Sequence, residues 1–238
     1  LVDAGWSNWE GQGRDSWDMI RELVDYSAPL GVKIWVWKAY PDDRGVDGIQ
    51  TPERLQAFLK KCRETGVAGV KIDYFYDESQ QVVRFYEDAL KEAAKYQLMV
   101  DFHGADKPTG LNRTFPNELT REGIRGLEIR GPWATHNTIL PFTRYLAGPA
   151  DFTPVTFSPK RLSETSWCHQ VATAVIFTSP FLCYGVDPEQ LLANPACDMV
   201  KYIPAVWDET IVLPGSEIGQ MALFARRKGD VWFVAGIC

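Results

Sequence analysis

The sequence predicts an α/β fold, a (β/α)8 barrel followed by the start of a C-terminal β-domain. Short apolar segments alternate with helical segments along most of the 238 residues, which is typical of parallel βα units. Polar residues follow several of these apolar segments, as in barrels whose active sites form at the carboxyl ends of the strands. No glycine-rich phosphate motif follows any strand, so a nucleotide-binding open sheet is disfavoured. We assign residues 1–215 to the barrel and 216–238 to the first hairpin of the β-domain.

Composition excludes several classes of partner. The chain is 45% hydrophobic with a net charge of -6, which is typical of a globular protein without a nucleic-acid or anionic-membrane partner. No apolar run reaches transmembrane length, no signal peptide is recognisable, and no cysteine spacing indicates zinc. The nine Trp and nine Tyr residues favour a carbohydrate ligand weakly, because aromatic faces often line sugar sites.

The first half of the chain alternates strands and helices. Strands are predicted at 1–6, 32–37, 69–75 and 98–104, and helices at 16–30, 52–62 and 80–96. Ser16 is the candidate N-cap of the first helix. Thr51, Pro52 and Gly66 provide the usual cap, first-turn proline and terminal glycine of the second helix.

The second half is less regular. We predict a loop at 105–125, a short strand at 127–129, a helix at 137–147 and an extended segment at 152–157. A helix at 166–179, a strand at 181–185 and helical residues at 188–205 follow. The apolar segments 219–226 and 231–235 flank a turn and predict an antiparallel hairpin.

Charged residues at the predicted strand ends are candidates for a catalytic site. Lys71 and Asp73 lie two residues apart, so both project from one face of their strand. Alone, this pair indicates a structural ion pair more readily than a site. Glycoside hydrolysis requires two carboxyl groups, about 5–5.5 Å apart in retaining enzymes. Asp73 and Glu128 are the pair that converges at the mouth of the predicted barrel.

Two segments together resemble a known family. The sequence HGADKPTGLNRTFPNELTREGIRGLE at 103–128, preceded by GVKIDYF at 69–75, closely resembles glycoside hydrolase family 97. The resemblance implies a (β/α)8 barrel between two β-sandwich domains, calcium at the active site, and activity on α-glucosides or α-galactosides. It also implies that 1–6 is the second barrel strand, so that the first strand is missing, and that the hairpin at 219–235 opens the C-terminal β-sandwich.

The resemblance further implies a retaining mechanism. Inverting members carry Glu after the histidine that ends the fifth strand, where this chain has Gly104, and strand 32–37 has no acidic residue. Asp73 matches the nucleophile of retaining, α-galactosidase-like members, and Glu128 matches the acid/base. Lys71 and His103 match ligands of sugar hydroxyl groups. Glu122 and Glu128 match calcium ligands, and at least one further ligand comes from the N-terminal domain of the family.

The resulting hypothesis is a retaining exo-acting α-galactosidase that forms a covalent glycosyl-enzyme. An α-glucosidase of the same family and a non-catalytic carbohydrate-binding barrel are the alternatives. We expect an oligosaccharide substrate, a calcium cofactor, no nucleic-acid or membrane partner, and, from the family resemblance, a periplasmic or secreted location.

Overall fold

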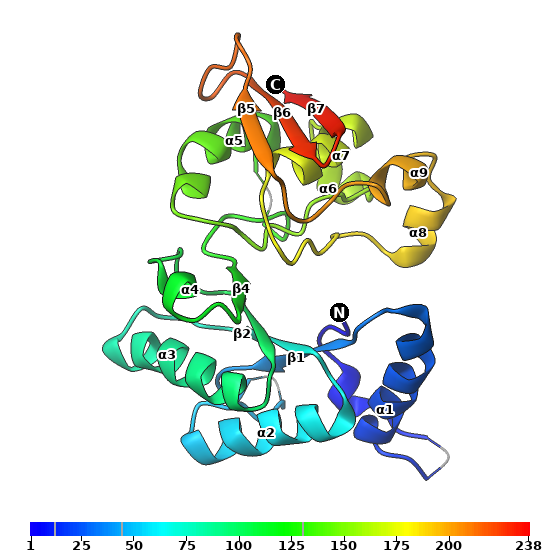
Figure 1. Cartoon of the computed structure of the whole chain (residues 1–238), viewed down its shortest axis with the longest axis vertical. Helices are drawn as coiled ribbons and strands as arrows, with labels where there is room; N and C mark the ends of the chain where they lie inside the picture. Colours follow the sequence, from blue (N-terminus) through cyan, green and yellow to red (C-terminus); the bar gives the residue numbers. More distant parts are fainter. Residues whose placement is uncertain (12, 44, 130) are drawn as a thin grey trace. The chain divides into compact units, whose positions relative to one another are not determined.

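The computed structural model describes residues 1–11, 13–43, 45–129 and 131–238 and divides into two compact units (Figure 1). The first unit comprises Leu1–Asp106 and Gly110–Arg121. The second unit comprises Lys107–Thr109 and Glu122–Cys238.

The first unit is an α/β structure built on a parallel sheet with the strand order β1-β2-β3-β4. Its strands are β1 (Trp35–Ala39), β2 (Gly69–Asp73), β3 (Met99–Phe102) and β4 (Glu118–Arg121). Its helices are η1 (Trp6–Asn8), α1 (Ser16–Ser27), η2 (Ala28–Leu30), α2 (Pro52–Thr65), α3 (Gln80–Lys95) and α4 (Leu111–Thr114). The βα alternation predicted for this half of the chain is therefore confirmed.

Side-chain caps define the helix boundaries. Thr51 accepts a hydrogen bond from the Arg54 amide at the start of α2, and Gly66 ends that helix with a φ of 88°, as predicted. The prediction for α1 was wrong by one residue. Asp15, not Ser16, is its N-cap, because Asp15 and Asp18 form a reciprocal capping box.

The predicted strand at 1–6 is reduced to one parallel bridge. Val2 pairs with Val36, donating its amide to the Trp35 carbonyl and accepting from the Trp37 amide. Trp6 already belongs to η1, with its ring buried. The first residues therefore extend the sheet beside β1 only at Val2.

The two faces of the parallel sheet carry different side chains. Apolar residues of β1, β2 and β3, such as Val36, Ile72 and Phe102, pack in one hydrophobic cluster with residues of α1, α2 and α3. Alternation along each strand places the intervening side chains on the opposite face. That face carries the polar candidates of the sequence, so the helices account for stability and leave the other face for chemistry.

The segment predicted as a loop at 105–125 contains α4 and β4. Strand β4 pairs in parallel with β3, with a register irregularity between Val100 and Asp101. Pro116 and the charged residues of Glu118–Arg121 concealed this strand in the sequence. Its charges are buried in an ion-pair cluster rather than exposed, as described below.

The second unit combines helices with an antiparallel sheet of order β5-β6-β7. Its helices are α5 (Trp133–Ile139), η3 (Leu140–Phe142), η4 (Arg144–Leu146), α6 (Pro159–Leu162), α7 (Trp167–Ile176), α8 (Pro188–Ala193) and α9 (Cys197–Val200). Its strands are β5 (Glu209–Val212), β6 (Ala222–Lys228) and β7 (Val231–Ile237). The predicted hairpin is confirmed as β6 and β7, and β5 adds a third strand.

Helix α7 packs against β7, and both contribute to one hydrophobic cluster. The prediction of a strand at 127–129 was wrong, because these residues form a turn. Residues 152–157 and 181–185 belong to no strand, although the Gly185 amide donates to the Pro154 carbonyl (2.8 Å). Among the described residues, no helix is both long and apolar enough to cross a membrane.

Candidate active site

Strand β2 carries Asp73 at its carboxyl end, and backbone pairing continues to that point on both sides. The Tyr40 amide donates to the Asp73 carbonyl (2.7 Å) from the β1 side, and the His103 amide donates to the Ile72 carbonyl (2.8 Å) from the β3 side. Asp73 is only 7% exposed. Because the strand is paired on both edges, the position of this carboxylate is set by the sheet rather than by a loop.

Both oxygens of the Asp73 carboxylate accept a hydrogen bond. The indole Nε1 of Trp37 donates to Oδ2 at 2.8 Å, and the Tyr74 amide donates to Oδ1 at 2.6 Å. Hydrogen bonds to an ionised acceptor are stronger than those between neutral groups. The two donors therefore fix the plane of the carboxylate and supply part of the solvation lost on burial.

The backbone beyond β2 turns sharply. Tyr74 has a φ of 69°, a conformation that non-glycine residues rarely adopt. Gly104 has a φ of 62°, and a Cβ at this position would lie 3.2 Å from both Asp73 Oδ1 and the Tyr74 amide nitrogen. Glycine at 104 therefore satisfies two demands at once, a left-handed conformation and close approach to the carboxylate.

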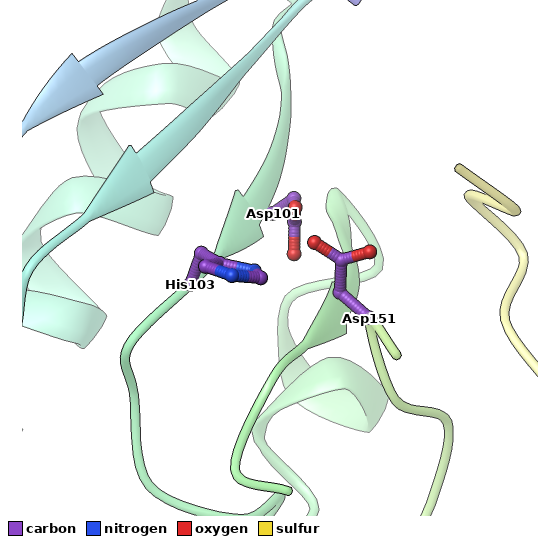
Figure 2. A group of neighbouring side chains, drawn as sticks. All are labelled: Asp101, His103 and Asp151. Atoms are coloured by element: carbon purple, nitrogen blue, oxygen red, sulfur yellow. The ribbon is translucent and has the colours of Figure 1, made fainter. Parts of the chain in front are cut away.

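The other predicted residues of the first unit lie on the same face of the sheet as Asp73. Lys71 is 3% exposed, and its Nζ lies 3.9 Å from Asp3 Oδ2. Asp101 and His103 come from the end of β3, two residues apart, and project to one side of the strand (Figure 2). Asp151, also labelled in Figure 2, belongs to the second unit and is buried.

A buried ion-pair cluster holds the segment that follows His103. Arg121 is 1% exposed and donates to Glu118 Oε1 (2.5 Å) and Asp106 Oδ1 (2.6 Å). Its guanidinium also lies 4.4 Å from the centroid of the Tyr86 ring. Burial raises the pKa of the Glu118 carboxyl, and the hydrogen bond and charge of Arg121 oppose that rise. These contacts show that Arg121 anchors the loop.

In the second unit, one arginine organises the backbone around Glu122. The Arg144 guanidinium donates to the carbonyls of Glu122 (2.9 Å), Gly123 (2.7 Å), Gly148 (3.0 Å) and Pro149 (3.1 Å). The Glu122 side chain is half-buried, and its Oε1 lies 3.7 Å from the position that a Cβ on Gly126 would occupy. Arg144 thus links residues 122–123 to residues 148–149 and fixes the backbone position of Glu122.

Glu128 is exposed on the turn 127–129 and borders a pocket of about 410 Å³. Trp133, Lys160 and Arg161 contribute to the same pocket. Arg161 Nη1 donates to the Leu127 carbonyl (2.8 Å), which ties the backbone beside Glu128 to α6. The pocket therefore presents one carboxylate among cationic and aromatic side chains.

Comparison with known proteins identifies the family. The model of glycoside hydrolase 97 matches residues 1–124, more than half of the chain. The chain belongs to glycoside hydrolase family 97. The C-terminal model of the same family, described as "Glycosyl-hydrolase 97 C-terminal, oligomerisation", matches residues 206–238.

Two curated relatives resemble this family 97 chain over nearly its whole length. A "Retaining alpha-galactosidase" from Bacteroides thetaiotaomicron is 36% identical over 240 residues, covering 92% of this chain and 34% of that protein. A "Probable retaining alpha-galactosidase" from Streptomyces bingchenggensis is 37% identical over 246 residues, covering 99% of this chain and 37% of that protein. The chain thus spans about a third of the length of these relatives.

Solved structures of other proteins share the fold. A crystal structure of a beta-arabinopyranosidase has a TM-score of 0.82 at 27% identity, covering 98% of this chain and 40% of that one. A glycoside hydrolase family 97 enzyme from Pseudoalteromonas sp. strain K8, in complex with acarbose, has a TM-score of 0.80 at 25% identity, covering 99% and 43%.

In this family 97 chain, the predicted site residues divide between the units. Asp73, Lys71 and His103 share one face of the parallel sheet, whereas Glu122 and Glu128 belong to the second unit. Sequence reasoning did not assign roles to Trp37, Tyr74 or Arg144. Trp37 lies on β1, the strand beside β2, and its indole N–H is the sequence feature from which a hydrogen bond to Asp73 could have been predicted.

Proposed function

We propose that the full-length protein is a retaining exo-acting α-galactosidase. The observation that carries the proposal is the Asp73 carboxylate, buried at a strand end, with one donor on each oxygen and only glycine facing it at position 104. Relatives named retaining alpha-galactosidase at 36% and 37% identity support the choice of sugar and of mechanism.

The reaction proceeds in two steps. Asp73 attacks the anomeric carbon while Glu128 donates a proton to the oxygen of the departing aglycone, giving a β-linked glycosyl ester. Glu128 then removes a proton from water as that water attacks the anomeric carbon, and Asp73 leaves as a carboxylate. Lys71 and His103 bind sugar hydroxyl groups.

We further propose that Glu122 and Glu128 bind calcium. Both offer carboxylate oxygens, which calcium prefers, and both come from one short segment whose backbone is held by Arg144 and Arg161. Calcium takes about six to eight oxygen ligands. Within the described part of the second unit, no group of three ligating side chains includes either residue. Carbonyl groups, water and other regions of the protein would complete the set. When bound, the ion polarises sugar and carboxylate oxygens.

For the whole protein, we propose that the parallel sheet is part of a (β/α)8 barrel and that residues 206–238 begin an oligomerisation domain. A periplasmic or secreted location and an oligosaccharide substrate complete the proposal. The match to a family 97 enzyme in complex with acarbose supports a saccharide ligand.

The test uses the full-length protein with an aryl α-galactoside. We expect hydrolysis in which time-resolved NMR detects the α-anomer of galactose first. The Asp73→Ala variant should lose activity, and azide should restore it while giving the β-galactosyl azide. The Asp77→Ala variant is the matched control, because Asp77 is an exposed carboxylate just beyond the same strand. Initial release of β-galactose would refute the retaining mechanism. Saccharide binding without hydrolysis would favour the binding-barrel alternative, and faster hydrolysis of an aryl α-glucoside the glucosidase.

A second substrate is favoured by one observation. The beta-arabinopyranosidase structure matches this chain over 98% of its length. A β-L-arabinopyranoside has the ring configuration of an α-D-galactopyranoside and lacks only the hydroxymethyl group at C5. The ratio of kcat/KM for the two aryl glycosides measures whether that group is bound. Equal values would indicate an enzyme that does not distinguish them.

A further inference from the structure

Trp37 donates a side-chain hydrogen bond to Asp73. Its Nε1 lies 2.8 Å from Asp73 Oδ2, and the indole is 3% exposed. An indole N–H donates only and carries no charge, so this hydrogen bond has a fixed direction and does not titrate. The contact therefore persists at any pH at which Asp73 is ionised.

The sheet register explains why Trp37 reaches this carboxylate. Directly opposite Asp73 on β1 is Ala39, whose side chain is too small to fill the space. Trp37 lies two residues earlier, opposite Lys71, and its long ring extends along the strand toward the Asp73 oxygen. Trp6 Nε1 in turn donates to the Trp37 carbonyl (2.7 Å), so the donor itself is held.

We infer that Trp37 is a positioning residue that makes Asp73 a better leaving group in the second step of the proposed reaction. The inference rests on the proposed function and extends it to a residue that does not touch the sugar. Strand β1, which lacks a carboxylate able to activate water, instead supplies an N–H to the nucleophile.

The chemistry follows from the change in charge on Asp73. As a free carboxylate it accepts a charge-assisted hydrogen bond, whereas in the glycosyl-enzyme it is a neutral ester and a weaker acceptor. In the second step the bond between the anomeric carbon and the Asp73 oxygen breaks, and both bonding electrons return to Asp73. The Trp37 N–H stabilises that developing negative charge and thereby accelerates breakdown of the intermediate, at a smaller cost to its formation.

The experiment replaces the N–H and keeps the shape. In the full-length protein, Trp37→3-benzothienylalanine substitutes sulfur for the indole N–H, and Trp37→Phe is the conventional variant. Trp35→Phe is the matched control, because Trp35 lies on the same face of β1 and packs over Gly69, away from Asp73. An aryl α-galactoside with a good leaving group makes breakdown of the intermediate rate-limiting.

We expect kcat of the benzothienyl variant to fall about tenfold, which corresponds to the loss of a charge-assisted contribution in the transition state. KM should fall with it, so that kcat/KM changes by less than about threefold. Mass spectrometry after acid quench should find more glycosyl-enzyme than in the wild type. Trp35→Phe should leave kcat unchanged.

An unchanged kcat would overturn the inference, and so would an equal fall in kcat and kcat/KM, since that pattern places the effect on the first step. The inference fails separately from the proposed function. A wild-type enzyme that hydrolyses the galactoside with retention, together with an unaffected Trp37 variant, would refute only the role of Trp37. A wild-type enzyme without retaining activity would refute the proposed function itself.

Discussion

Replacing Gly104 with alanine tests how closely the backbone after β3 approaches Asp73, the proposed nucleophile. The change adds one methyl group at a residue with a φ of 62°. That methyl carbon would lie 3.2 Å from Asp73 Oδ1 and 3.4 Å from the Phe75 amide nitrogen. These distances are shorter than ordinary contacts, so the carboxylate or the backbone must move by a few tenths of an ångström.

Two costs are separable. Any L-residue at this φ pays about 1 kcal/mol for the left-handed conformation. Only at position 104 would the added methyl group also displace Asp73. Since a misplacement of about 1 Å can reduce the rate about a hundredfold, a shift of a few tenths should reduce kcat/KM several-fold, up to about tenfold. Gly110→Ala is the matched control, because Gly110 has a φ of 95° and no atom within 4 Å of its virtual Cβ.

The assay compares kcat/KM for an aryl α-galactoside and the Tm of the full-length variants. We expect similar losses of Tm for both alanine variants and a loss of activity for Gly104→Ala alone. Equal activities of the two variants would refute the steric reasoning. The same geometry predicts that Gly104→Glu, which introduces the residue of the inverting members, abolishes retaining activity by crowding the nucleophile with a second carboxylate.

Two further predictions concern Arg121, which is buried, and Arg144, which is half-buried. Arg121→Met should lower stability by about 3–5 kcal/mol, because it leaves buried carboxylates unpaired, whereas exposed Arg113→Met should have little effect on Tm. Burial raises the folded-state pKa of Glu118. The protonated Glu118 side chain therefore contributes to the free energy of unfolding at low pH, and this contribution is lost as the pH rises through the folded-state pKa. The Tm deficit of Arg121→Met should therefore shrink from pH 7 toward pH 5, and a constant deficit would contradict the role of Glu118. Arg144→Met should weaken calcium binding, because it removes the hydrogen bond that holds the backbone of Glu122. Calorimetry measures the calcium affinity, and an unchanged affinity would show that Arg144 does not support the metal site.

The well-predicted part of the fold consists of elements with local signals. Helix α2 has its cap, its first-turn proline and its terminal glycine within the sequence itself. Strand β2 is an apolar segment with Lys71 and Asp73 at its end, and its predicted position is confirmed. In both cases the information lies in neighbouring residues, so no knowledge of the remaining chain was needed.

Elements that depend on distant partners were predicted poorly. Strand β4 reads as a charged loop because Glu118 and Arg121 neutralise each other only once they are buried with Asp106. The turn at 127–129 reads as a strand because Leu127 and Ile129 are apolar, although the structure pairs them with no other strand. In each case local composition indicated the opposite of what the tertiary contacts favour.

The sequence by itself determined the family, the βα alternation and Asp73 as the central carboxylate, since these are encoded in contiguous residues. The tertiary structure alone decided how that carboxylate is held. Trp37 and Asp73 are far apart in the chain and meet through the register of two strands, with Ala39 leaving the necessary space. Gly104 approaches Asp73 because the adjacent strand β3 ends beside β2. Strand pairing is a non-local property, and it determines the environment of Asp73, the proposed nucleophile.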